Sequence, residues 1–139
     1  MIEVIDTGII ASSAPINDCV RAGRHVWLVV IAEDPVTGAI TDGDIEAQTR
    51  QALLNLQQAI RAAGGELTNL VQVQIFLVDS ADAPGMNRVY AEFFNHKPYP
   101  IRATVVVKEL LAKGLRIEIT ATAVLDQDPE VHPAPISVP

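Results

Sequence analysis

The sequence is short of several residue types, and each shortage excludes a class of protein. Cysteine occurs once, at Cys19, so no disulfide can form within the chain. That composition suits a reducing compartment, and we expect a cytoplasmic protein. Basic residues are also few: 10 Lys and Arg stand against 17 Asp and Glu, for a formal net charge of -7. We expect no nucleic-acid partner, because affinity for a phosphate backbone depends on clustered basic side chains.

Long apolar runs are missing as well. No stretch approaches the ~20 apolar residues that cross a bilayer, so we expect no membrane partner. The first residues lack a basic region followed by an apolar one, which predicts no signal peptide. The chain does have 139 residues that are 49% hydrophobic, enough for the core of one domain. We assign residues 1–125 to that domain and residues 126–139, which include four prolines, to an extended tail.

Local patterns predict five strands and two helices. Residues 25–32 (HVWLVVIA) form a β-branched and aromatic run, which is typical of a strand covered on both faces. Residues 44–63 carry apolar side chains at three- and four-residue steps, with Asp44 as N-cap and Gly64 at the helix end. The other strands are predicted at residues 2–6, 71–78, 101–107 and 115–124, and a second helix at 84–94.

This order of elements favours an α+β fold, with one mixed sheet that carries two helices on one face. Such a domain leaves the other face of the sheet bare. Strands as apolar as residues 25–32 do not leave that face in water, because a large exposed apolar patch marks an interface. We therefore expect the chain to associate with copies of itself.

Six segments resemble motifs of the RidA (YjgF) family, also described as endoribonuclease L-PSP-like proteins. They occur in the family's order, over about residues 3–125: DPVTG at 34–38, QTRQALLNL at 48–56, AAG at 62–64, NRVYAEFF at 87–94, PIRATV at 100–105 and RIEI at 116–119. The resemblance implies a chorismate-mutase-like fold, a homotrimer with ligand clefts between neighbouring subunits, and no cofactor. It also implies hydrolysis of reactive enamines and imines.

The resemblance assigns roles to three polar residues. Arg102 matches the arginine that binds substrate, and its guanidinium can clamp a carboxylate bidentately; the alternative is a structural salt bridge. Glu118 matches an acid that orients or activates water; the alternative is a solvated strand glutamate. Asn87 opens a helix motif and either lines the cleft or simply caps the helix.

The chain departs from the family pattern at the wall of the cleft. Ile16 stands where deaminating members carry a tyrosine, and Leu28 and Val29 replace the serine and glycine of an S-G-Q motif. Thr104 replaces a cysteine two places after the arginine. We include these four residues with Arg102 and Asn87 in the predicted substrate-binding set, and we assign catalysis to Arg102 and Glu118.

The leading hypothesis is a 2-iminobutanoate/2-iminopropanoate deaminase-like hydrolase that releases a 2-keto acid and ammonia. The alternative is a non-catalytic protein that senses a carboxylated metabolite in the same cleft. Ribonuclease activity is disfavoured by the acidic charge and by the absence of a paired histidine or basic groove. No metal is expected, because the three histidines, His25, His96 and His132, lack metal-ligand spacing.

Overall fold

The computed structural model describes residues 1–127 of the chain. The predicted tail therefore lies outside the described residues, apart from its first two positions. Within residues 1–127 the chain forms one six-stranded sheet, in the order β1-β2-β3-β6-β4-β5. The strands are β1 (Glu3–Val4), β2 (Cys19–Ala22), β3 (His25–Ile31), β4 (Leu70–Leu77), β5 (Ile101–Val106) and β6 (Ile117–Val124). All neighbours pair antiparallel except β4 and β5, which are parallel, so the sheet is mixed.

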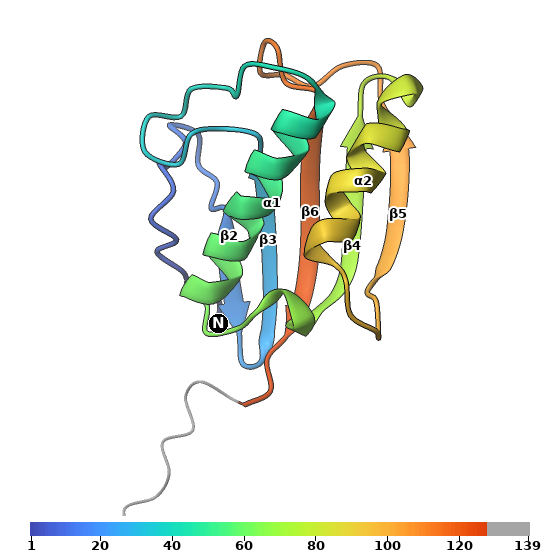
Figure 1. The fold of residues 1–139 in the computed structure, drawn as a ribbon. Helices are drawn as coiled ribbons and strands as arrows, with labels where there is room; N and C mark the ends of the chain where they lie inside the picture. The colour runs from blue at the N-terminus through green and yellow to red at the C-terminus, as the bar shows by residue number, and fades with distance from the viewer. Residues whose placement is uncertain (128–139) are drawn as a thin grey trace, which may run out of the picture.

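Two helices, α1 (Ile45–Ala62) and α2 (Ala83–Phe93), lie side by side across one face of the sheet (Figure 1). The predicted fold class is therefore confirmed. Two short 3₁₀ turns, at Leu67–Asn69 and Ser80–Asp82, lie between α1 and α2. No helix within residues 1–127 has the length and apolar character needed to cross a membrane.

The ends of α1 follow from local chemistry. Asp44 caps the first turn, where its carboxylate accepts a hydrogen bond at 2.9 Å from the backbone N–H of Ala47. At the other end Gly64 adopts a φ of 95°, and the N–H of Gly65 donates back to the carbonyl of Ile60 at 2.9 Å. The helix therefore begins and ends within one residue of the predicted limits.

The two helices pack closely near the start of each. Gly85 of α2 is buried against α1, and a Cβ placed there would lie 2.7 Å from Cγ2 of Ile45. No larger residue fits without a shift of the helices. This close approach fixes α2, and with it the residues that α2 presents toward β5.

The sheet separates its side chains by strict alternation. On β6, Ile117, Ile119, Ala121 and Ala123 are buried beneath the helices, whereas Glu118 and the residues that alternate with them point to the opposite face. No helix of residues 1–127 covers that second face, which we call the open face. Trp27 is 43% exposed there and Val105 is 46% exposed. The prediction that residues 25–32 form a strand covered on both faces is thus not met within a single chain.

One strand was not predicted from the sequence. Residues Cys19–Ala22 form β2 and pair with β3 as an antiparallel hairpin. The segment has only four residues, mixes apolar and charged types, and shows no period of two. The strand is stabilised by its pairing with β3, and the pattern of its own four residues does not predict that pairing.

Candidate functional site

A cavity of about 710 Å³ opens beside the end of β3 and the start of β6. Its walls come from the N-terminal segment, the loop before β2, the last residues of β3 and the turn that follows it. The lining residues are Val4, Ile5, Asp6, Thr7, Ile9, Ile10, Ala11, Ser12, Ile16, Asn17, Asp18, Val29, Val30, Ile31, Glu33, Gly38, Asn55 and Glu118. Three of the predicted site residues, Ile16, Val29 and Glu118, therefore lie together in this cavity.

Glu118 enters the cavity from the open face of β6. It pairs in register with Ile31 on one side and with Phe76 on the other, so both flanking side chains on that face are apolar. Burial raises the pKa of the Glu118 carboxyl above its ordinary value. A carboxyl group whose pKa is raised toward neutrality exchanges protons more readily at working pH.

Three further carboxylates, Asp6, Asp18 and Glu33, line the cavity and were not predicted, and Asp18 and Glu33 interact with each other. Burial raises the pKa of Glu33, and the neighbouring charge of Asp18 raises it further. The hydroxyl of Thr7 donates a hydrogen bond of 2.8 Å to Asp18. Among residues 1–127, no lysine, arginine or histidine lines the cavity. None of these acids follows a motif, and only the approach of the N-terminal segment to the end of β3 reveals that they share a site with Glu118.

Asn55 of α1 holds the end of β3 at the base of this cavity. Its side-chain amide donates to the backbone carbonyls of Ile31 and Glu33, each at 2.9 Å. Its own carbonyl accepts a hydrogen bond of 2.9 Å from Gln51, one turn earlier. The buried amide thus ties the helix to the strand that faces Glu118. Its position in the segment at 48–56 was noted in the sequence, but its structural role was not.

Arg102 lies on β5, the strand at the far edge of the sheet. Its Nη2 donates a hydrogen bond of 2.8 Å to Oδ1 of Asn87, and its guanidinium carbon lies 4.6 Å from the centre of the Tyr90 ring. Within the part of the chain that the structure describes, Arg102 has no carboxylate partner. The guanidinium is held in place by α2, yet its charge is not neutralised.

The two halves of the predicted site lie on opposite faces of the sheet. Arg102 points toward α2, and the register places it beside Val73 of β4, which is buried in the core. Glu118 points to the open face. Thr104 lies two residues after Arg102 on β5, so both side chains point to the same face of the sheet. A single chain therefore brings Arg102, Asn87 and Thr104 together at one place and Ile16, Val29 and Glu118 at another.

Leu28 belongs to neither group. It is 4% exposed and packs in the core between sheet and helices. It also contributes to a smaller cavity, of about 380 Å³, on the open face near Trp27 and Thr120. The serine-to-leucine difference at this position therefore alters the core, whereas the glycine-to-valine difference at Val29 alters the open face.

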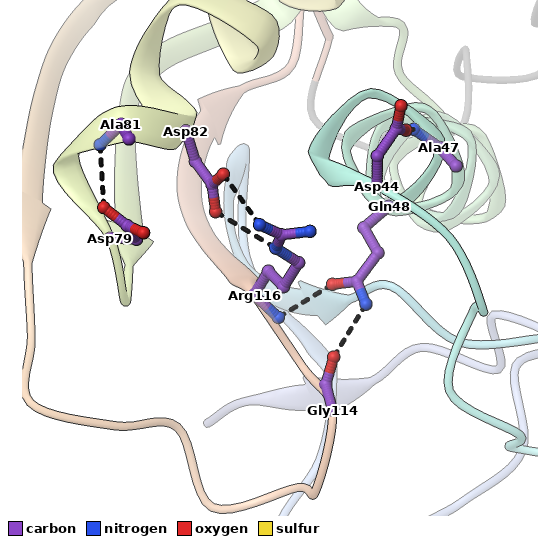
Figure 2. A network of polar contacts seen from close by, with 8 residues as sticks. All are labelled: Asp44, Ala47, Gln48, Asp79, Ala81, Asp82, Gly114 and Arg116. Carbon is purple, nitrogen blue, oxygen red and sulfur yellow. Dashed lines mark hydrogen bonds and ion pairs between the residues drawn. The ribbon is translucent and has the colours of Figure 1, made fainter.

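A buried polar network fixes the chain immediately before Glu118 (Figure 2). Gln48 of α1 donates to the carbonyls of Thr41 and Gly114, at 3.0 and 2.8 Å, and accepts from the backbone N–H of Arg116 at 2.7 Å. The Arg116 guanidinium makes two hydrogen bonds to the carboxylate of Asp82, at 3.1 and 3.0 Å. The β6 end of the loop that joins β5 to β6 is thus anchored by α1 and by the turn before α2.

Comparison with known proteins decides the family. The profile of the endoribonuclease L-PSP family matches residues 9–125. A RutC family protein from Pyrococcus horikoshii is 40% identical over 110 residues, which cover 78% of this chain and 86% of that protein. A human 2-iminobutanoate/2-iminopropanoate deaminase is 33% identical over 111 residues, which cover 79% and 80%. The chain belongs to the RidA family.

Solved structures of RidA proteins share the fold. RidA from an Antarctic Psychrobacter species superposes with a TM-score of 0.81 at 29% identity, over 88% of this chain and 99% of that one. E. coli TdcF, solved with bound serine, gives a TM-score of 0.81 at 31% identity, over 88% and 98%. The sheet with two helices on one face is therefore the RidA arrangement.

Within residues 1–127, two other reactive side chains, Cys19 and His25, lie outside the cavity. Cys19 is 1% exposed, and burial raises the pKa of its thiol to about 12, so it stays protonated and unreactive. His25 stacks on Trp27, with ring centres 5.8 Å apart. Among residues 1–127 no group of three or more His, Cys, Asp or Glu is arranged to hold a metal ion.

Proposed function

We propose that this RidA protein hydrolyses 2-imino acids and their enamine tautomers to 2-keto acids and ammonia. An enamine first takes a proton at its β-carbon and becomes the imine. Water then adds to the imine carbon, the C–N bond breaks as the added hydroxyl loses its proton to become the keto carbonyl, and the nitrogen leaves as ammonium. Relatives about one third identical bear the name of this activity, among them the human deaminase at 33%. The E. coli relative with bound serine supports an amino-acid-like ligand.

The observation that carries the proposal is that the guanidinium of Arg102 is oriented by its neighbours but is not paired with a carboxylate among residues 1–127. Those neighbours are Asn87 and Tyr90. An arginine held in this way offers paired N–H donors to the carboxylate of an imino acid. Because its rotamer is already restricted, less conformational entropy is lost when the substrate binds.

Glu118 supplies the proton transfer that the hydrolysis needs. In its ionised form it accepts a proton from the attacking water, and it returns that proton to the leaving nitrogen. Its partly buried position favours this exchange, because burial raises its pKa toward the working range. Reaction at an imine that is already protonated needs no further Lewis acid, and every step uses groups that the chain itself carries.

Arg102 and Glu118 act on one substrate only if they come from different copies of the chain. They lie on opposite faces of one sheet, whereas, within residues 1–127, β5 has a free edge and no helix covers the open face. We therefore propose a homotrimer in which Arg102, Asn87 and Thr104 of one subunit close over Ile16, Val29 and Glu118 of the next. Closed cyclic symmetry forms each of the three clefts in the same way.

The first test measures ammonia release from freshly generated 2-aminoacrylate by the purified protein. Arg102→Ala is expected to abolish release while the assembly stays intact in size-exclusion chromatography. Arg61→Ala is the matched control, because Arg61 bonds Glu66 on the surface, away from both groups. Unchanged kinetics in Arg102→Ala would remove this arginine from the site.

The second test asks whether the cleft is shared. Arg102→Ala and Glu118→Gln chains are each expected to be inactive alone. When they are unfolded and refolded together, about one cleft in four combines an intact Arg102 with an intact Glu118 in a cyclic assembly. Recovery of about one quarter of the wild-type activity supports the shared cleft. Absence of recovery in verified mixed oligomers contradicts it.

A second candidate function is ligand sensing without turnover. It is favoured by Val29, whose side chain occupies the open face where the deaminating pattern carries glycine. Saturable binding of 2-keto acids, with no ammonia released from any imino acid, would support this candidate over catalysis.

A further inference from the structure

We propose that the cavity beside Glu118 selects 2-imino acids whose side chains are branched, aliphatic and uncharged, with Val29 and Ile16 as the specificity-determining residues. This inference rests on the proposed function, because it assumes that the reacting carbon lies between Arg102 and Glu118. It goes further by naming the substrate class.

The first argument is the position of Val29. Val29 pairs in register with Thr120, and Ile31 pairs with Glu118, so Val29 and Glu118 are diagonal neighbours on adjacent strands of the open face. Side chains in that relation lie within reach of one another. Val29 is half-buried and lines the cavity, so its branched side chain stands where a substrate's own side chain would pass Glu118.

The second argument is that most of the apolar side chains that line the cavity are aliphatic and branched. Ile5, Ile9, Ile10, Ile16 and Ile31 line the same cavity as Val29, and Ile16 is 62% exposed in the free chain. A three-carbon imino acid leaves most of this aliphatic surface in contact with water. A branched side chain covers it and displaces that water, which favours binding with each added methylene group.

The third argument is size. The cavity measures about 710 Å³. Cavities of ~300–1,000 Å³ bury ligands much larger than a three-carbon acid. The replacement of a glycine by Val29 has therefore not closed the site. It has reshaped the part next to Glu118 and left room for a longer substrate.

The fourth argument is charge. The carboxylates of Asp6, Asp18, Glu33 and Glu118 line the cavity, and no basic side chain from the described part of the chain accompanies them. A substrate with a second carboxylate is repelled, since like charges close together in a partly buried site interact strongly. Imino acids derived from glutamate or aspartate are thereby excluded. A cationic side chain such as that of lysine is the competing case, which the test decides.

The test compares kcat/KM for imino acids generated in situ by an amino-acid oxidase from leucine, alanine, glutamate and lysine. The leucine-derived imine is expected to exceed the alanine-derived one by about 10-fold or more, the effect of added methylenes in an apolar pocket. The glutamate-derived imine is expected to be the poorest. A ratio near one, or a preference for the lysine-derived imine, overturns the inference.

Variants locate the selectivity. Val29→Ala and Ile16→Ala are each expected to lower the leucine-to-alanine ratio several-fold, mainly through weaker use of the branched substrate. Val36→Ala is the matched control, because Val36 is 77% exposed and does not line the cavity. An unchanged ratio in both cavity variants assigns the selectivity elsewhere and removes Val29 and Ile16 from this role.

A binding measurement separates this inference from the proposed function. Calorimetry compares 4-methyl-2-oxopentanoate, pyruvate and 2-oxoglutarate, which are the keto-acid counterparts of three of the imines. If no imine is hydrolysed but the branched keto acid binds tightest, the deaminase proposal fails, and the preference of the cavity for branched aliphatic side chains stands. If imines are hydrolysed without preference, the inference fails and the deaminase proposal stands. If no keto acid binds and no imine is hydrolysed, both fail.

Discussion

The side chain of Gln48 accepts a hydrogen bond of 2.7 Å from the backbone N–H of Arg116, so a residue of α1 fixes the chain two positions before Glu118. The same side chain donates to two carbonyls from different loops. One buried amide therefore sets the start of β6 relative to the helix layer. The distance from Glu118 to the cavity walls depends on this connection.

Replacement of Gln48 tests that connection. Gln48→Leu keeps an apolar stem but leaves the N–H of Arg116 and the carbonyls of Thr41 and Gly114 without their partner. We expect a loss of stability on the order of 3 kcal/mol, because buried polar groups without partners are costly. Urea unfolding measures it. Gln57→Leu, on the same helix and outside this network, is expected to change stability little, and equal losses in the two variants would contradict the prediction.

Replacement of Arg102 by lysine tests whether geometry or charge alone binds the substrate. Arg102→Lys keeps a positive charge but cannot donate bidentately, and it loses the planar contact with Tyr90. We expect KM to rise about 10- to 100-fold, which corresponds to ~1.5–3 kcal/mol for a charged hydrogen bond. Steady-state kinetics provide the measurement. If lysine restores full activity, the paired-donor account is wrong and only charge is needed.

The raised pKa of Glu118 predicts how the stability of the folded protein changes with pH. Because burial disfavours the charged form, the folded protein binds a proton more tightly than the unfolded chain does. The stabilisation from protonated Glu118 is complete below the unfolded pKa, near 4.5, and is lost as the pH rises through the higher folded pKa. Glu118→Gln is therefore expected to raise the melting temperature at pH 7 relative to wild type and to lose that advantage in acid.

Calorimetric melting of both proteins across this pH range provides the check. Glu66→Gln is the control, since Glu66 lies on the surface in an ion pair with Arg61. A difference between wild type and Glu118→Gln that does not vary with pH would mean that Glu118 is not desolvated in the folded protein.

The Cys19 thiol is expected to be inert in the native protein. It is buried, and its pKa of about 12 leaves almost no thiolate at neutral pH. Iodoacetamide is expected to leave the folded protein unmodified by mass spectrometry and to add one adduct in denaturant. Rapid modification of the native protein would show that β2, which carries Cys19, opens readily.

The sequence predicted α1 best, because its apolar period, the Asp44 cap and the Gly64 end all indicate the same limits. It missed β2, whose four residues depend on pairing with β3. For the site, residue types were identifiable but their arrangement was not. Nothing local shows that Arg102 and Glu118 point to opposite faces, since that depends on the register of β5, β4 and β6.

Asp18 and Glu33 are two further site residues that the sequence pattern could not reveal. Each lies next to a turn or a strand end and looks like an ordinary solvent-facing acid. Only the fold of the N-terminal segment across the end of β3 places them in one cavity with Glu118. Side chains that meet through loops carry no periodic signal, so a structure was needed to find them.

The placement of Arg102 on an edge strand has a consequence for how the protein responds to its own abundance. If anchor and acid belong to different subunits, a dissociated chain carries one half of each of two clefts and no complete cleft. Specific activity then falls on dilution, and a bound substrate, which bridges two subunits, shifts the equilibrium toward the assembled form. The turnover rate per chain would then report the concentration of the chain as well as that of its substrate.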